Sequence, residues 1–271
     1  MFGHLLSALR KRRVQSRLER HAIPDSLWTL TLSRHPFLSR RSEEDLKRLR
    51  TLATLFLGTK EFTGAAGQEI TDEVAVSIAA QACLPVLELG LGWYDSFVGI
   101  VVYPDEVVAR REVVDDDGIV HLYDEALSGE AMPGGPVVLS WRDVSESSEW
   151  AGEAAYNVVI HEFAHVIDMR DGQADGIPPL VDSRERHDWI EALDEAYAAH
   201  ANAVEADIET TMDPYGAEGP EEFFAVSSES FFIEPQALLK AHPKWYAALS
   251  RFFRQDPAHQ PLGEPAPEGA G

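Results

Sequence analysis

The chain has 271 residues, of which 45% are hydrophobic, so it is long enough for one large packed domain, and its formal net charge is −23. It has no apolar run near the ~18 residues of a membrane-spanning helix and no signal-peptide pattern, so we expect a cytoplasmic protein without a transmembrane segment. The single cysteine, Cys83, excludes an internal disulfide, and its apolar neighbours favour a small buried side chain over a reactive thiol.

The start of the chain differs in charge from the rest. Residues 1–50 contain 12 Lys and Arg against 5 Asp and Glu, and the remaining residues contain 11 basic against 41 acidic side chains. The acidic part argues against extensive nucleic-acid binding. Residues 1–20 combine an apolar helical face with a basic cluster, and two interpretations stay open: a helix that binds a membrane or nucleic acid, or one that pairs with the acidic body.

Two helices are predicted in the first third of the chain. The first follows Ser42, because acids fill its first turn and apolar residues then recur at helical spacing. The second begins near Thr71 and is interrupted at Pro85. Between the two helices, the sequence EFTGAAGQ predicts a turn.

The middle of the chain changes its periodicity. Residues 96–141 contain short segments rich in β-branched and aromatic residues, separated by Gly, Asp and Pro, and predict a small sheet. Helical patterns return at about 147–169, 184–203, 221–233 and 243–254. This order predicts an α+β protein, mostly helical with a small mixed sheet. We expect three parts: a basic N-terminal helix and loop at 1–40, a main domain at 41–256, and a flexible acidic and Pro-rich tail at 257–271.

The segment YNVVIHEFAHVIDMRDG, residues 156–172, contains two histidines four residues apart around a glutamate. On a helix, His161 and His165 point within about 40° of each other, so both imidazoles can bind one zinc ion. Glu162 lies a quarter turn away, where it can act as a base toward zinc-bound water. Ionisable groups on an apolar helix are costly unless they are paired or bind a metal. The alternative is that the histidines belong to a polar cluster without a metal.

Two further residues of this helix share the face of His161. By the same angles, Asp168 lies about 20° from His161 and Asn157 about 40°. Metal-bound histidines usually donate their second ring proton to a carboxylate or carbonyl, so Asp168 is a candidate for that acceptor. The alternative is that Asp168 accepts a hydrogen bond from a nearby backbone N–H.

A catalytic zinc site needs a third protein ligand. No downstream histidine has the short spacing that would place it beside the motif, so a carboxylate is favoured. In the segment DPYGAEGPEEFFAVSSESFF, residues 213–232, Pro220 predicts a helix start. Glu222 and Glu229 share one face of this helix, whereas Glu221 points elsewhere. The residue pattern alone leaves the ligand role divided between Glu222 and Glu229.

The segments VVIHEFAHVIDMRDG and DPYGAEGPEEFFAVSSESFF resemble the Mlc titration factor A family of glucose-regulated zinc metallopeptidases, which are similar to the catalytic domain of anthrax lethal factor. EFTGAAGQEITDEV, LPVLELGLGWYDSFVGIVVYP and PVVLSWRDV extend the resemblance over most of residues 40–255. The resemblance implies a zincin-like fold and one Zn²⁺ per chain, with Glu222, directly before a Phe-Phe pair, as the third ligand beside His161 and His165. It implies that Tyr215 acts on the substrate carbonyl. Glu229 then remains either a residue behind the ligands or a solvated helix acid.

Together these patterns predict a zinc metallopeptidase that hydrolyses peptide bonds by Glu-assisted attack of zinc-bound water. The resemblance implies aminopeptidase-like cleavage. The alternative is a regulatory binding protein, because the resembled family sequesters a transcriptional repressor of sugar transport. Two smaller features stay open: PVVLSW is either the edge strand that holds an extended substrate or a core strand, and the LGWYDSF loop either lines the cleft or packs.

Overall fold

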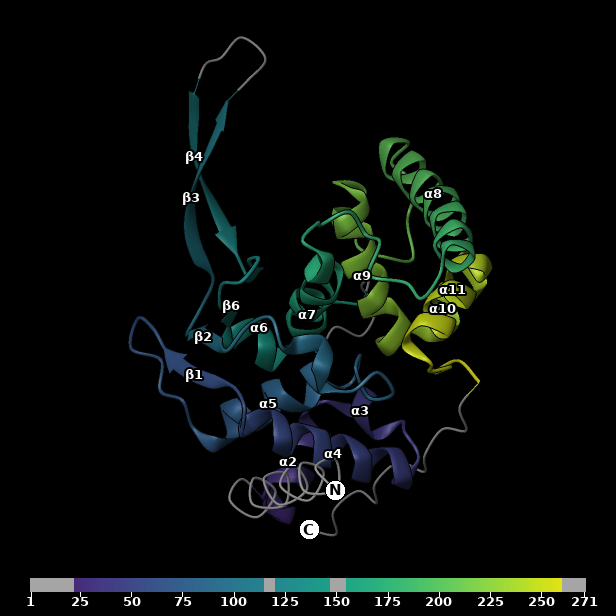
Figure 1. Ribbon diagram of the computed structural model, residues 1–271. Coiled ribbons are helices and arrows are strands. Elements are labelled where there is room, and N and C mark those ends of the chain that lie inside the picture. Colours follow the sequence, from purple (N-terminus) through teal and green to yellow (C-terminus); the bar gives the residue numbers. More distant parts are fainter. Residues whose placement is uncertain (1–21, 115–119, 147–154, 260–271) are drawn as a thin grey trace, which may run out of the picture.

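The computed structural model describes residues 22–114, 120–146 and 155–259 (Figure 1). The α-helices are α2 (Asp25–Arg34), α3 (Pro36–Ser39), α4 (Glu43–Leu57), α5 (Asp72–Cys83), α6 (Trp141–Glu146), α7 (Val158–Asp168), α8 (Ser183–Glu205), α9 (Pro220–Ile233), α10 (Pro235–Ala241) and α11 (Pro243–Phe253). The strands are β1 (Glu61–Gly64), β2 (Gly99–Tyr103), β3 (Val107–Val114), β4 (Val120–Leu127), β5 (Gly129–Ala131) and β6 (Val137–Ser140). Short 3-10 helices are η1 (Leu91–Tyr94), η2 (Met169–Asp171) and η3 (Pro214–Ala217). This mostly helical content with a small mixed sheet confirms the predicted α+β class. The predicted basic helix at 1–20 and most of the predicted tail lie outside the described residues, and the division into three parts stays a prediction.

The main sheet has the strand order β1-β2-β6-β5. β1 and β6 both pair with β2 in parallel, whereas β5 pairs antiparallel with β6, with Gly129 opposite Leu139 and Ala131 opposite Val137. The segment PVVLSW contains β6, which is an interior strand, so of the two interpretations the core strand is confirmed and the edge strand was wrong. The edge strand next to β6 is β5, which was missed because its three residues Gly-Glu-Ala have too little β propensity to be recognised.

The strands predicted for residues 96–141 divide between two sheets. β3 and β4 form a separate antiparallel hairpin that projects away from the rest of the chain (Figure 1). The main sheet gains β1, from a segment predicted to be a turn, because Glu61 pairs with Gly99 at the start of a four-residue register. The turn itself follows directly, where Ala66 and Gly67 have positive φ angles.

Both predicted helix starts in the first third are confirmed. The Ser42 hydroxyl accepts a hydrogen bond from the N–H of Asp45 at 3.1 Å, and the Thr71 hydroxyl accepts one from Val74 at 3.3 Å. α5 ends at Cys83, shortly before the proline that was predicted to interrupt it. Cys83 is fully buried, and burial raises the pKa of its thiol, which confirms the predicted inert side chain.

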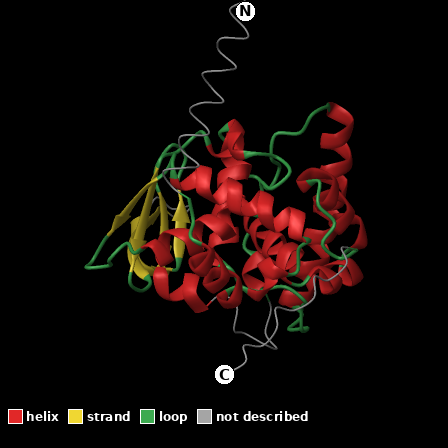
Figure 2. Cartoon of the chain, turned by 90° about the horizontal axis from the view of Figure 1, so that it is seen from below, coloured by secondary structure: helices red, strands yellow, loops and turns green. Residues whose placement is uncertain are grey.

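α7 packs against α5, α9, β5 and β6, and Figure 2 shows the strands gathered on one side of the helices. Nine of its 11 residues are buried, and the two exceptions are His161 and His165. Phe163 packs its ring against Phe56, Tyr94 and Phe97. Burying such a side chain contributes about 1.5–3 kcal/mol. The apolar faces of α7 therefore fix the direction in which its two histidines point.

Three helix predictions need correction. α7 begins at Val158 rather than near residue 147, because Asn157 is extended (φ −155°) and caps the helix by accepting a hydrogen bond from the N–H of Ile160. Residues 147–154 of that predicted helix lie outside the described residues. Residues 25–39, predicted as loop, form α2 and α3, and the short α10 was missed. In α2, α3 and α10, a proline at the N-cap or N1 position starts the helix.

No helix in the described ranges is long and apolar enough to cross a membrane.

Candidate metal centre and active site

His161 and His165 lie one turn apart on α7 and face the same point. Their Nε2 atoms are 3.2 Å apart. Each imidazole is 12% exposed, although the rest of the helix is buried. The i, i+4 spacing thus brings the two imidazoles together as predicted.

Glu222 completes a triangle of donor atoms from the first turn of α9. Its Oε2 atom is 3.1 Å from Nε2 of His161 and 3.3 Å from Nε2 of His165. Zinc at about 2.0–2.1 Å from three donors, with tetrahedral angles, would separate them by roughly 3.3 Å. Within the part of the chain that the structure describes, these residues are the one group of three or more His, Cys, Asp or Glu side chains close enough to share an ion. The donor set therefore fits a zinc ion with a fourth position left for a non-protein ligand.

The charges of the three donors also suit a cation. Burial alone would raise the pKa of Glu222, but hydrogen bonds with His161 and His165 outweigh it and lower that pKa to about 2, so the carboxylate stays ionised. Burial lowers the pKa of His161, but its hydrogen bonds to Glu222 and Glu229 outweigh burial, so the pKa lies well above its usual value. The site thus holds positive charge between carboxylates, and a bound metal ion would replace a proton there.

Glu229 lies directly behind His161. Its Oε1 atom accepts a hydrogen bond from Nδ1 of His161 at 2.8 Å, and the carboxylate is only 1% exposed. The bond places the imidazole proton on Nδ1 and leaves Nε2 free to bind an ion. Of the two roles left open by the sequence, a solvated helix acid is excluded.

Asn157 does not face the donor triangle. As the N-cap of α7 it lies outside the helix, so the angular estimate that placed it near His161 does not apply. Its backbone N–H donates to the second oxygen of Glu229, and its side-chain amide donates to Gln81 at 2.7 Å. Asn157 therefore contacts Glu229, which lies behind the imidazole of His161, and it meets His161 only at the backbone, where its carbonyl accepts the His161 N–H at 3.0 Å.

Asp168 was predicted to accept a hydrogen bond either from a histidine or from a nearby backbone N–H; the first prediction was wrong and the alternative is confirmed. Its carboxylate accepts a hydrogen bond from the backbone N–H of Gly176 at 2.9 Å, and its other oxygen is buried without a partner. Burial raises its pKa to about 7, against the hydrogen bond from Gly176. The helix ends at this residue, so its carboxylate meets the following loop before it can reach an imidazole.

Glu162 is 5% exposed and lies against the edge strand. A Cβ added at Gly129 would come within 2.6 Å of the Glu162 carboxylate, so a larger residue there would force this side chain to shift. Burial raises the pKa of Glu162, although the two imidazoles beside it partly oppose the shift. A carboxylate with a raised pKa, next to the donor triangle but outside it, is suited to proton transfer near neutral pH.

Tyr215 lies on η3, at the open side of the triangle. Its ring centroid is 6.0 Å from that of His161, and the side chain is 46% exposed. Its backbone N–H donates to Asp213 at 2.9 Å, which fixes the start of η3. The structure therefore brings together six predicted residues: His161, Glu162, His165, Tyr215, Glu222 and Glu229.

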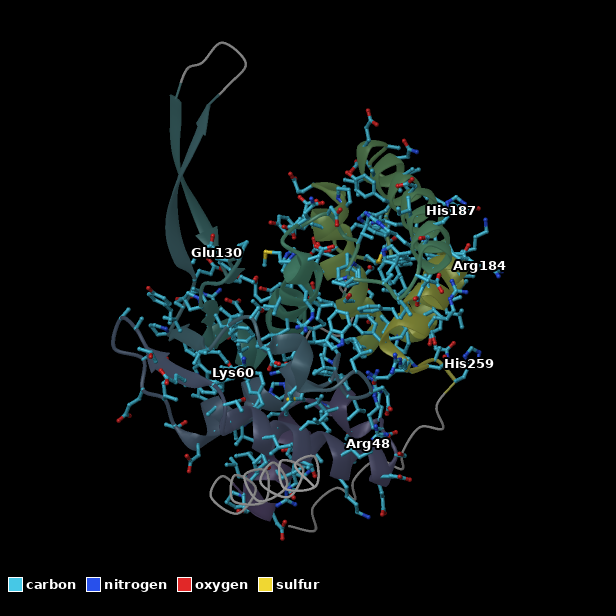
Figure 3. The ribbon with its side chains drawn as sticks, viewed as in Figure 1. Arg48, Lys60, Glu130, Arg184, His187 and His259 are labelled. Atoms are coloured by element: carbon cyan, nitrogen blue, oxygen red, sulfur yellow. The ribbon has the colours of Figure 1, made fainter. Side chains whose placement is uncertain are left out.

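Two cavities of about 210 Å³ each meet at these residues. Both are lined by Gly129, His161, Glu162 and Tyr215. The first extends toward Tyr156, Val158 and Val226, and the second toward Ala131, Met169, Ala174 and Glu221. β5 borders both, and Figure 3 shows Glu130 of this strand near the base of the β3–β4 hairpin.

The LGWYDSF loop packs instead of lining these cavities. Trp93 meets Phe252 edge-on, and Tyr94 is 1% exposed, with its hydroxyl donating to the Ala82 carbonyl at 2.8 Å. His187 on α8 and His259 after α11 lie at the outer edge of the helical part, away from α7 (Figure 3).

Comparison with known proteins agrees with the donor triangle. Residues 8–254 match the model of one protein family, described as glucose-regulated metallo-peptidase M90. The chain belongs to the M90 family. Its relatives include the Mlc titration factor A proteins of Edwardsiella ictaluri (40% identical over 227 residues, 82% of this chain and 85% of the relative) and of Escherichia coli O1:K1 (36% over 251 residues, 90% and 91%). The protein of the same name from Pectobacterium atrosepticum is 36% identical over 225 residues, 82% and 83%. The resemblance inferred from the sequence is thus confirmed, and a metallopeptidase family implies a metal ion.

Several residues of the candidate site were missed by reasoning from the sequence. Gly129 gives no local signal beyond one glycine ahead of a predicted strand, and Tyr156 resembles an ordinary core aromatic. Gln81 did carry a signal, since it is a lone amide in the apolar segment SIAAQACLPV. Its partner, Asn157, is 76 residues away, so the contact could not be read from local spacing.

Proposed function

We propose that this M90 chain is a zinc-dependent, zincin-like metallopeptidase that hydrolyses peptide bonds. His161, His165 and Glu222 bind one Zn²⁺, Glu162 is the general base and Tyr215 stabilises the oxyanion. The observation that carries the proposal is the triangle of three donor atoms with the Glu162 carboxylate buried beside it. A bound zinc ion supplies a Lewis acid that acidifies water and polarises a carbonyl.

Glu162 moves the protons of the reaction. It accepts a proton as a water oxygen attacks the carbonyl carbon, and it gives that proton to the nitrogen as the C–N bond breaks. Its burial favours this role, because a carboxylate with a raised pKa is a better base and, once protonated, a ready acid near neutral pH. Glu229 holds the orientation of His161 throughout.

Tyr215 acts on the oxygen of the substrate carbonyl. Its exposed position beside both cavities gives its hydroxyl access to a bound peptide. A phenol is a neutral donor, and donation to the oxygen that gains negative charge stabilises the transition state.

The edge strand β5 is the proposed binding site for the peptide backbone. Among the described strands it pairs with β6 only, and its residues line both cavities, so we expect an extended peptide to pair with its other side. Cleavage next to a free N-terminus, which the resemblance implies, is supported by Glu130 and Glu221 in the second cavity, because their carboxylates attract an ammonium group.

The test compares aminoacyl p-nitroanilides with N-acetylated internal peptides, using protein that is chelated and then reloaded with zinc, manganese or cobalt. We expect loss of hydrolysis on chelation, recovery with zinc, and at least tenfold faster cleavage of substrates with free amines. Equal cleavage of acetylated peptides would contradict the aminopeptidase proposal only. No cleavage of any substrate by the zinc-loaded chain would contradict the peptidase proposal.

A second function is supported by the name of the relatives, Mlc titration factor A. We propose that the chain also binds a transcriptional repressor of the Mlc type, which would place it in the cytoplasm. Purified Mlc should bind wild type and Glu162→Gln equally, because binding does not need the base. Failure of Mlc to bind either protein would contradict this proposal and leave the peptidase proposal unaffected.

A further inference from the structure

A line of buried polar side chains runs from His161 into the N-terminal half of the chain. Its members are Glu229, Asn157, Gln81, Ser77 and His35, each at most 1% exposed. The contacts cross from α9 to the N-cap of α7, then to α5 and to the junction of α2 and α3. Apolar side chains would fill the same volume without the cost of burying amides, so this line calls for a reason beyond packing.

The first two steps fix the metal ligand. Nδ1 of His161 donates to one oxygen of Glu229 at 2.8 Å, and the backbone N–H of Asn157 donates to the other. Both oxygens of Glu229 therefore have defined partners, and the carboxylate plane cannot turn without breaking one contact.

The next step fixes Asn157. Its side-chain oxygen accepts from the N–H of Ile160 at 2.9 Å, and its amide nitrogen donates to Oε1 of Gln81 at 2.7 Å. The helix cap needs only the oxygen, so the contact with Gln81 is additional to capping. It determines which way the Asn157 amide faces and thereby supports the backbone N–H that holds Glu229.

Gln81 is itself held in one orientation. Its Nε2 atom donates to the carbonyl of Ser77 at 3.2 Å and lies 3.3 Å from Nε2 of His35. The amide oxygen is thus directed toward Asn157, and a reversed amide would face donor against donor.

We propose that Gln81 is a positioning residue for the metal ligand His161, acting through Asn157 and Glu229. The proposal rests on the metal site of the proposed function. It makes α5, which contributes no ligand, part of the support of the metal centre.

The test measures zinc affinity by competition with a chromophoric chelator, without substrate. Gln81→Met keeps the volume but removes the amide's contacts with Asn157, the Ser77 carbonyl and His35. We expect zinc affinity to fall about tenfold, since partners behind a ligand typically contribute 10–100-fold. Ser77→Ala is the matched control: it lies one turn away on α5, is equally buried, and its hydroxyl contacts His35 rather than Asn157. We expect its zinc affinity to stay within about twofold of wild type.

Gln81→Glu serves as the conservative variant, because it keeps the oxygen that accepts from Asn157, and its zinc affinity should lie within about threefold of wild type. Thermal unfolding of each zinc-free variant separates a loss of fold stability from a loss of metal affinity. A Gln81→Met protein that binds zinc as tightly as wild type would overturn the proposal for Gln81 alone. A wild-type chain that binds no zinc would overturn the proposed function as well.

Discussion

A buried carboxylate lies at each end of α7, yet the two carboxylates hold different parts of the site. At the N-terminal end, Glu229 accepts hydrogen bonds from the imidazole of His161 and from the cap residue Asn157. At the C-terminal end, Asp168 accepts one from the backbone of Gly176. Glu229 therefore orients His161, the proposed metal ligand, and Asp168 orients a loop.

The loop at the C-terminal end of α7 packs against the start of α9, which contains Glu222. Gly176 has a φ of +74°, and a Cβ there would lie 2.5 Å from the carbonyl oxygen of Pro220, the first residue of α9. Trp189 also donates to the carbonyl of Gly176 at 2.9 Å. Since Glu222 follows Pro220 by two residues, the loop after α7 packs against the backbone beside the proposed third ligand. The segment that packs against each acid therefore decides its role more than its angle on the helix does.

The largest effect on zinc binding should come from removing Glu222, the proposed third ligand. Glu222→Ala should weaken zinc binding by more than 100-fold, beyond the ~10–100-fold typical of residues behind a ligand. Glu221→Ala removes the neighbouring carboxylate of the same turn and should change affinity by less than about threefold. Chelator competition measures both variants, and an equal loss in the two would contradict the assignment of Glu222.

Gly129→Ala should separate catalysis from metal binding. The added Cβ would displace the Glu162 carboxylate, so kcat should fall by roughly 10²–10⁴-fold, the usual contribution of a general base, while zinc stays bound. Gly92→Ala is the control, because a Cβ there meets only Asp95 at 3.9 Å. If Gly129→Ala kept wild-type kcat, the contact between edge strand and base would have no role in turnover.

Gly176→Ala and Gly172→Ala isolate the packing at the C-terminal end. Both glycines have positive φ, so each alanine should cost about 1–2 kcal/mol of unfolding free energy. Only Gly176→Ala also meets the Pro220 carbonyl, and we expect it to cost roughly 2 kcal/mol more in urea unfolding and to weaken zinc binding. Equal losses in the two variants would show that the contact with Pro220 carries no strain.

Asp168→Asn should have the smallest effect, seen in the pH dependence of stability. Because the folded-state pKa of Asp168 of about 7 lies above its ordinary value of 3.8, the folded chain binds the proton more tightly, and the stability that this group contributes falls as pH rises from about 4 to 7. The variant lacks this loss, so its advantage over wild type in urea unfolding should grow by roughly 1–3 kcal/mol between pH 5.5 and pH 8. A constant difference would mean that Asp168 is ionised in the fold at both pH values.

Much of the fold and part of the site could be predicted because they depend on local patterns. Capping at Ser42 and Thr71 and the shared face of His161 and His165 follow from residues within one or two turns. Glu222 was separated from Glu229 only through the resemblance, since both share one face of α9. The roles of the two glutamates follow from which ring nitrogen of His161 each one meets.

Other features could not be predicted because they depend on distant contacts or on exact boundaries. Asn157 and Asp168 were assigned by helical angles, but one lies just outside α7 and the other meets the following loop. β5 is three residues long and is defined by its pairing with β6. Gly129 and Gln81 gain their significance only from side chains of α7 and its cap that tertiary packing brings to them.

The most direct test of the central claim is zinc content and peptide turnover of Glu162→Gln beside wild type. The account predicts equal zinc per chain, because Glu162 is not a ligand, and turnover lower by roughly 10²–10⁴-fold, because proton transfer is lost. Equal turnover in the two proteins, or loss of zinc from the variant, would contradict the assignment of Glu162 as the base of a metallopeptidase.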